Sequence, residues 1–299
     1  MSVFRSAPAL FWRAFFLIMS AAAGTSVAIA APKGQVAPPL TQVGRLDPAE
    51  GRKALEAVRR QGIDGDYYLE FQLRVMPRRG EERLIPGKLW GGRNEIGPLS
   101  RVALTLDEPG KTPFERRLLI QNGRSSSVWR WETDGAVKML GAASPFEPVV
   151  PDTDLTAFDL QMPFLFWDSF SYEGLKRFRG RPAYVLVLRP PADFAAKYPA
   201  LTGVRVHLDT QYDALVQTEL LGANDVVLKT ISLVDLKKVG EQWIPKTLDG
   251  RDEKTRNKTR FDVVAAALNL DFSRMLFEPA QLGEPLRPPS GPQLVRLDQ

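Results

Sequence analysis

Residues 115–140 read ERRLLIQNGRSSSVWRWETDGAVKML, and this stretch decides the fold. Asn122-Gly123 and Asp134-Gly135 are dipeptides that favour tight hairpins, because their residues tolerate the positive φ values that such turns require. The segments around these turns have strand length and are rich in aliphatic and aromatic residues. The stretch therefore predicts consecutive hairpins of an antiparallel meander. The predicted strands are 115–121, 126–132 and 137–140.

The same strand pattern extends in both directions along the chain. Leu69, Phe71, Leu73 and Val75 alternate with polar residues, as in a strand with one buried face. In all, the sequence predicts about eleven strands, and it has no long helices between strands of the kind that a parallel βαβ fold requires. The other predicted strands lie near residues 67–75, 83–90, 102–106, 183–188, 204–208, 215–221, 226–236, 241–248 and 259–268.

The helical patterns are short. Asp47 and Pro48 are typical of a helix start, and Ala54, Leu55 and Val58 form an apolar stripe behind them. A second short helix is predicted in the middle of the chain, capped by Asp152 or Thr153, with Leu155, Phe158 and Met162 on one side. Residues 192–198 suit one helical turn, and 273–283 a terminal helix or loop.

These patterns predict one fold class and one domain. The fold is mainly β (α+β): a single curved antiparallel sheet with helices covering its concave face. The predicted domain spans residues 47–283, after a Pro-rich linker at 31–46. Residues 284–299 contain several prolines and few apolar residues, so they are predicted to be a loose tail.

The first thirty residues have the pattern of an export signal. Arg5 and Arg13 precede and flank an uncharged apolar run, and Ala28-Ile29-Ala30 is a small-x-small cleavage pattern. We expect cleavage after Ala30 and a periplasmic location. The alternatives are a retained N-terminal anchor and a eukaryotic secretory route.

Signals of catalysis are weak. The chain has no cysteine, which excludes disulfides, thiolate nucleophiles and zinc-thiolate sites. His207 is the only histidine; it lies on the strand face opposite Val206 and Leu208, so we interpret it as a surface residue rather than a catalytic base. We expect no metal site, no cofactor and no enzymatic activity. The net charge of +5 comes from interspersed charges, which does not favour a nucleic-acid partner.

The surplus of apolar residues is more informative. Apolar side chains on the concave face, together with a Phe/Trp-rich segment, are candidates to line or cover a lipid cavity, because each buried methylene contributes about 0.8 kcal/mol. The alternative is an ordinary core filled by the helices. The candidate residues are Leu69, Phe71, Leu73, Leu104, Leu106, Phe158, Met162, Phe164, Phe166, Trp167, Val204 and Val206.

An ordered set of short motifs resembles the LolA-like periplasmic outer-membrane lipoprotein-sorting superfamily, and in particular a divergent branch of it. The resemblance covers residues 155–282. This chain lacks the cysteine that members of the branch commonly have in the strand that contains Tyr184. The matching motifs are Asp154-Leu155 before the Phe/Trp-rich segment, Tyr172-Glu173-Gly174, Gly180 to Leu188, Tyr198 before the 204–209 strand, Trp243-Ile244-Pro245, the 249–259 hairpin and Phe277-Glu278-Pro279 with Leu282.

The resemblance implies an open half-barrel that shields lipid beneath helices. Carriers of this superfamily accept lipoprotein acyl chains from an inner-membrane release complex and pass them to an outer-membrane acceptor. Related members sense lipoproteins instead. The main hypothesis is therefore a lipid or lipoprotein carrier with membrane-bound donor and acceptor proteins. The alternative is a regulatory or scaffold module that binds another envelope protein through a sheet edge or the 249–259 hairpin.

Overall fold

The computed structural model describes residues 47–107, 110, 112–132, 135–140, 144–289 and 293–297. Contacts divide the chain into the units 1–38 and 39–299, and all described residues belong to the second. The predicted export signal at 1–30, the linker at 31–46 and Asp134 of the second hairpin turn lie outside the described residues.

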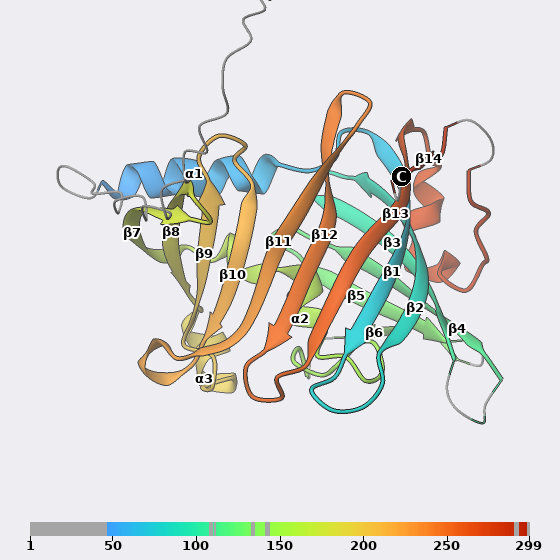
Figure 1. Cartoon of the computed structure of the whole chain (residues 1–299), viewed down its shortest axis with the longest axis horizontal. Helices are drawn as coiled ribbons and strands as arrows, with labels where there is room; N and C mark the ends of the chain where they lie inside the picture. The colour runs from blue at the N-terminus through green and yellow to red at the C-terminus, as the bar shows by residue number, and fades with distance from the viewer. Residues whose placement is uncertain are drawn as a thin grey trace, which may run out of the picture. The chain divides into compact units, whose positions relative to one another are not determined.

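One antiparallel sheet contains every described strand (Figure 1). The strand order is β6-β5-β4-β3-β2-β1-β13-β12-β11-β10-β9-β8-β7, and β14 pairs with β13 off this path. The described strands are β1 Asp66–Met76, β2 Arg83–Arg93, β3 Pro98–Leu106, β4 Phe114–Gln121, β5 Ser127–Glu132, β6 Lys138–Leu140, β7 Ser169–Phe178, β8 Arg181–Arg189, β9 Gly203–Asp209, β10 Leu215–Leu221, β11 Val227–Val239, β12 Gln242–Asp252, β13 Lys258–Leu270 and β14 Val295–Arg296.

Two meanders make up this sheet. Strands β1 to β6 follow one another as hairpins, and so do β7 to β13. The meanders join where β1 pairs with β13, from Asp66 opposite Leu270 to Met76 opposite Lys258. In the described part of the chain β6 and β7 are the outer edges and do not pair, so the sheet is open, as predicted.

The sheet has more strands than the sequence predicted: fourteen in the described residues, against twelve predicted ranges. The prediction missed β7 and β14. Strand β7, SFSYEGLKRF, contains few aliphatic residues, and a register shift between Tyr172 and Gly174 breaks its alternation. Strand β14 has only two residues, which is too short for a periodic pattern.

Three α-helices and four short 3-10 helices complete the described elements. Helix α1 and the one-turn helix α3 occur where they were predicted, and the Asp47 side chain caps α1 by accepting a hydrogen bond from Ala49 N at 2.9 Å. None of the described helices is both long and apolar enough to span a membrane. The helices are α1 Pro48–Arg60, α2 Ala157–Gln161, α3 Ala192–Lys197, η1 Pro163–Phe166, η2 Ala223–Asp225, η3 Arg274–Phe277 and η4 Pro279–Gln281.

The predicted cap of α2 was wrong. Thr153 lies in a preceding turn, where its hydroxyl donates to Val150 O, and Thr156 caps the helix. The Thr156 hydroxyl accepts a hydrogen bond from Asp159 N, while the Asp159 carboxylate accepts one from Thr156 N at 2.8 Å. This reciprocal capping box decides where the helix begins.

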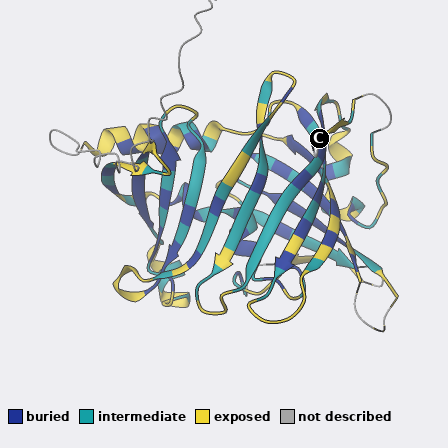
Figure 2. Cartoon of the chain, in the orientation of Figure 1, coloured by how far each residue is buried: buried dark blue, intermediate teal, exposed yellow. Residues whose placement is uncertain are grey.

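Segments cover part of each face of the sheet, and Figure 2 shows buried residues among intermediate and exposed ones along its strands. The inner face carries α1 and the segment between β6 and β7; buried Val102 and Leu118 point to this side and contact Val149. The outer face carries residues 271–289, called the C-terminal segment below; Leu99 and Leu119 point there and pack against Phe277 and Leu282. Alternation along β3 and β4 therefore serves two apolar layers rather than one.

The predicted tail, residues 284–299, contacts the sheet through three aliphatic anchors in its described part, while most of the described residues between them are exposed. Leu286 and Leu294 pack against Tyr68 and Trp90 on the outer face, and Leu297 is only 4% exposed. The sequence pattern missed this because a few apolar anchors among prolines do not form a period.

Candidate functional site

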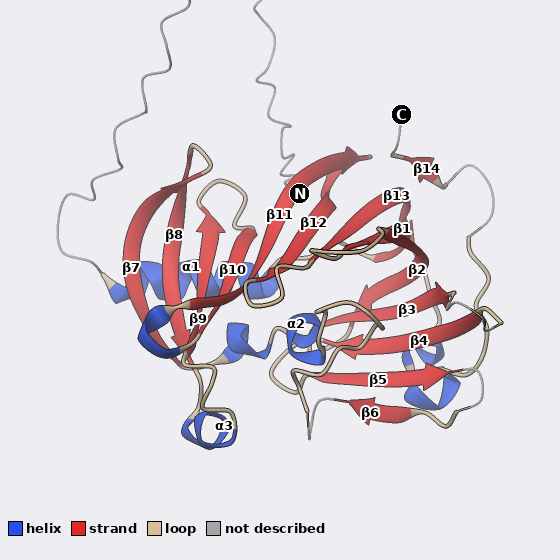
Figure 3. Cartoon of the chain, turned by 60° about the horizontal axis from the view of Figure 1, so that its bottom comes forward, coloured by secondary structure: helices blue, strands red, loops and turns tan. Residues whose placement is uncertain are grey.

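The segment that connects β6 and β7 lies across the inner face of the sheet. Its described part, residues 144–167, contains α2 and η1 and is called the inner segment below. Figure 3 shows α2 between the two halves of the curved sheet. Met162 has a φ of 45°, in the left-handed region, and this residue turns the chain from α2 into η1.

Apolar contacts of the inner segment join two hydrophobic clusters. Val149, Val150 and Ala157 pack with side chains of β1 to β5. Phe158, Phe164, Leu165 and Trp167 pack with β7 to β10 and with the apolar stripe of α1. The inner segment therefore covers apolar surface on both halves of the sheet.

The structure distributes the twelve predicted lipid-site residues over three clusters. Phe71, Leu73, Leu104 and Leu106 belong to the first cluster, beside Val149. Leu69 lies in a separate group around Val263. The remaining seven residues belong to, or pack against, the cluster that contains the α1 stripe. Their role in lipid binding remains a prediction; these seven residues are Phe158, Met162, Phe164, Phe166, Trp167, Val204 and Val206.

A buried ion pair fastens the inner segment to the sheet. Lys229 of β11 lies 2.5 Å from the Asp159 carboxylate of α2, and the two side chains are 9% and 1% exposed. Lys229 also donates a hydrogen bond to the carbonyl of Asp154. Buried charges are tolerated only when they are paired and hydrogen-bonded. Separating α2 from β11 therefore costs free energy, because it breaks the Lys229–Asp159 pair.

Four more side chains donate to backbone carbonyls of the inner segment. Arg116 of β4 donates to Val149 O at 2.8 Å, and Arg83 of β2 donates to Pro151 O at 3.0 Å. Asn122, after β4, donates to Leu160 O and Gln161 O at 2.7 and 2.9 Å. Arg59 of α1 donates to Leu165 O at 2.6 Å and to Trp167 O at 3.4 Å.

Sequence reasoning missed these five donors, although a signal exists. Arg116 has the same parity as Leu118 and Ile120 on β4, and Lys229 the same parity as Ile231 on β11. A cation on the apolar face of a strand is expected to have a buried partner. The sequence does not show that this partner is the main chain of a distant segment.

His207 is not the surface residue that the sequence predicted. Its side chain lies on the face opposite Val206, as expected, but it is only 13% exposed. The Phe178 ring covers it at 5.0 Å between centroids, and Glu219 lies 3.8 Å away. His207 and Arg205 lower the pKa of Glu219 to about 2. The sequence prediction placed His207 on the surface because it missed strand β7, whose Phe178 ring covers the His207 side chain.

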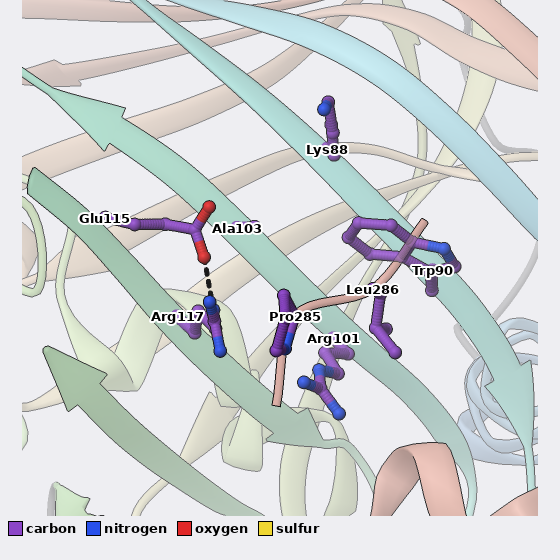
Figure 4. Close-up of a pocket in the computed structure, with 8 residues that line it drawn as sticks. All are labelled: Lys88, Trp90, Arg101, Ala103, Glu115, Arg117, Pro285 and Leu286. Carbon is purple, nitrogen blue, oxygen red and sulfur yellow. Dashed lines mark hydrogen bonds and ion pairs between the residues drawn. The ribbon is translucent and has the colours of Figure 1, made fainter. Parts of the chain in front are cut away.

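Two hollows lie on the outer face. The smaller, of about 40 Å³, lies beneath Pro285 and Leu286 of the C-terminal segment, and Lys88, Trp90, Arg101, Ala103, Glu115 and Arg117 complete its lining (Figure 4). Arg101 is 2% exposed and donates to Leu276 O at 2.9 Å, and its burial lowers the pKa of the guanidinium to about 10. The larger hollow, of about 320 Å³, adjoins it over β1 to β3.

The described residues offer little chemistry beyond binding. No three histidine or acidic side chains of the described part converge as metal ligands. The charges of the predicted 249–259 hairpin are largely used internally, since Lys258 and Arg260 both pair with Asp249 at 2.7 Å. The inner segment covers apolar surface on both halves of the sheet.

Comparison with known structures assigns the fold. A domain from Vibrio parahaemolyticus assigned to outer membrane lipoprotein sorting is similar at a TM-score of 0.63 and 16% identity, over 79% of this chain and 97% of that one. A LolA superfamily protein from Nitrosomonas europaea is similar at a TM-score of 0.56 and 16% identity, over 76% of this chain and 96% of that one.

A DUF1329 family protein from Desulfovibrio piger is similar at a TM-score of 0.62 and 15% identity, over 77% of this chain and 98% of that one. A family model described as "Uncharacterized protein" matches residues 148–284, from the inner segment to the C-terminal segment. No curated protein matches the sequence. The chain therefore has the LolA-like fold that its sequence motifs predicted.

Proposed function

We propose that this protein is a non-enzymatic periplasmic binder of lipid or lipoprotein acyl chains, and that the inner segment is the cover of its binding surface. The observation that carries this proposal is the position of residues 144–167, which join two apolar clusters and cover both. Displacement of this one segment exposes a continuous aliphatic and aromatic surface.

The way in which the inner segment is held supports a reversible cover. All five donors hydrogen-bond to its backbone carbonyls, and Lys229 also pairs with the Asp159 carboxylate. Such bonds each contribute about 1 kcal/mol net, since water replaces them on opening. Opening then costs the separation of Lys229 from Asp159 and the exposure of apolar surface, and an acyl chain offsets the second cost by occupying that surface.

The fold and the sequence agree with a carrier in the cell envelope. The export-signal pattern in residues 1–30 directs the chain out of the cytoplasm, and the LolA-like fold is shared with domains assigned to lipoprotein sorting. One fold serves several functions, so the inner segment and the clusters it covers carry the proposal rather than the fold alone.

Native mass spectrometry of the chain purified without detergent tests the proposal. We expect extra mass that corresponds to phospholipid or acylated peptide, together with saturable binding of a fluorescent acyl probe. Leu104→Asp, at a buried position on the inner face of β3, should abolish both, whereas Val234→Asp, at an exposed position of β11, should change neither. A chain that carries no lipid and refuses the probe would contradict the proposal.

Arg59→Met gives a second, independent test. This substitution removes both hydrogen bonds from α1 to η1 and should raise the affinity for the acyl probe, because the cover opens more easily. Arg60→Met is the matched control at an exposed position of the same helix. Equal probe affinity in the two variants would show that opening of the inner segment does not limit binding.

A further inference from the structure

Strands β12 and β13 pair over only part of their length. Their ladder runs from Thr247 opposite Asp262 to Arg251 opposite Lys258. Strand β12 begins earlier, at Gln242, and pairs there with β11 alone, while β13 continues to Leu270 and pairs there with β1. Figure 1 shows the two strands diverging above the shared ladder. The sheet therefore contains an internal gap between Gln242–Lys246 and Val263–Leu270.

Strand β14 occupies this gap. Val295 and Arg296 pair antiparallel with Ala266 and Ala265, and Leu297 N donates to Val264 O at 2.9 Å. Leu297 is buried in a cluster with Leu69, Val239, Ile244, Val263 and Ala266. The C-terminal chain thus acts as a short inserted strand with one aliphatic anchor.

The gap is larger than the strand that fills it. Strand β14 pairs with two residues of β13, whereas eight residues of β13 lie beyond the β12 ladder; at the far end of the gap the Gln242 side chain of β12 donates to Asn269 Oδ1 at 3.4 Å. The chain leaves the edge at Leu294, which packs on the outer face with Tyr68 and Trp90. Unpaired strand edges are templates for an added strand, and the small side chains of Ala265, Ala266 and Ala267 permit its close approach.

An acidic side chain beside the gap selects a basic residue in the strand that fills it. Arg296 lies 3.0 Å from Glu70 on the neighbouring β1, and Tyr68 also donates to this carboxylate. Beside it lies the larger outer-face hollow of about 320 Å³, which Glu70, Val264 and Arg296 line together with Pro86 and Gly87. A segment that extends beyond β14 has room in this hollow.

We propose that the gap between β12 and β13 is a strand-binding site for an extended segment of a partner protein, and that β14 occupies it when the partner is absent. The segment recognised carries an aliphatic residue for the Leu297 position, directly preceded by a basic residue for Glu70. Main-chain pairing to Val263–Leu270 provides the affinity and these two side chains the specificity. The proposal does not require lipid on the inner face, although the Leu297 cluster includes Leu69, one of the candidate lipid residues.

The test uses the full chain and a fluorescent peptide with the sequence of residues 293–299, QLVRLDQ. In the intact protein the tethered β14 competes at high local concentration, so the peptide should bind weakly. Leu297→Asp in the full chain removes the anchor of β14. We expect this variant to bind the peptide at least about tenfold more tightly than the intact chain, because the tethered β14 no longer competes for the gap. Circular dichroism and melting curves of both chains establish that each is folded.

Charge reversal distinguishes this site from unspecific adhesion. Glu70→Arg, combined with Leu297→Asp, should lose affinity for QLVRLDQ and regain it for QLVELDQ. Equal peptide binding by the intact and Leu297→Asp chains, or no saturable binding by either, would overturn the proposal. So would an intact chain that is a dimer and becomes a monomer on Leu297→Asp, because the occupant would then be the tail of a second copy.

Discussion

At the residue scale, the inner face depends on a few cations that point inward among aliphatic side chains. Lys229 is the deepest of them, and its ammonium pairs with the buried carboxylate of Asp159. Removing one member of a buried pair leaves the other charge unpaired in an apolar site. An exposed pair, such as Lys238 with Glu241 at 48% and 95% side-chain exposure, lacks this penalty.

Lys229→Met should lower the free energy of unfolding by about 3 kcal/mol, because Asp159 remains buried without its partner. Lys238→Met, the same change in an exposed ion pair, should cost less than about 0.5 kcal/mol. Urea denaturation measures both values, and hydrogen exchange of residues 157–167 should accelerate only in Lys229→Met. Equal costs in the two variants would show that the buried pair does not hold the inner segment.

Glu219 predicts a pH dependence of stability. Its folded-state pKa, about 2, lies below the usual value of 4.5, so the carboxylate stabilises the fold at pH values above about 4.5. This contribution is lost as the pH falls from 4.5 through 2. Wild type should therefore exceed Glu219→Gln in thermal stability at pH 6 and lose most of this advantage at pH 2.5. A constant difference between the two melting temperatures would refute the assignment.

At the element scale, most strands follow from alternation and turn chemistry, whereas strand β2 depends on its neighbour. Gly87 and Gly91 weaken a strand by themselves, but the rings of Phe71 and Tyr67 on β1 lie over them. A Cβ at Gly87 would lie 2.2 Å from Phe71 Cζ. The glycine and the ring therefore form one packing unit across two strands.

Gly87→Ala should destabilise the protein by about 1–3 kcal/mol, because the Phe71 ring must move within a filled cluster. Gly250→Ala, on β12 of the same sheet, is the control, since its nearest contact would be an ordinary 3.7 Å. Thermal denaturation of the two variants compares them. A Gly87→Ala protein as stable as Gly250→Ala would mean that the ring is free to relocate.

At the scale of the whole molecule, the described strands form two meanders that share one hydrogen-bonded junction, β1 with β13. Phe71 and Phe261 meet across this junction with ring centroids 4.6 Å apart. The inner segment bridges the meanders a second time through the two large apolar clusters. The meanders are therefore expected to unfold together.

Phe71→Ala should cost about 3–5 kcal/mol and lower a single cooperative transition, because the junction belongs to both meanders. Met139→Ala, at an exposed position of edge strand β6, should change stability by less than about 0.5 kcal/mol. Far-UV circular dichroism and tryptophan fluorescence should report the same midpoint in each variant. Two separate midpoints would show that the meanders are independent units.

The sequence by itself determined the local elements: the β4–β5 hairpin, although its loop spans residues 122–126 and only Gly123 has a positive φ, the start of α1 at Asp47, and a mainly β fold with an apolar concave face. These follow from interactions between residues close in the chain. Only the tertiary structure decided that β1 pairs with β13, that Lys229 meets Asp159, and that Leu297 fills a gap in the sheet. These contacts join distant residues, and their pairing depends on how whole elements pack, which no local pattern specifies.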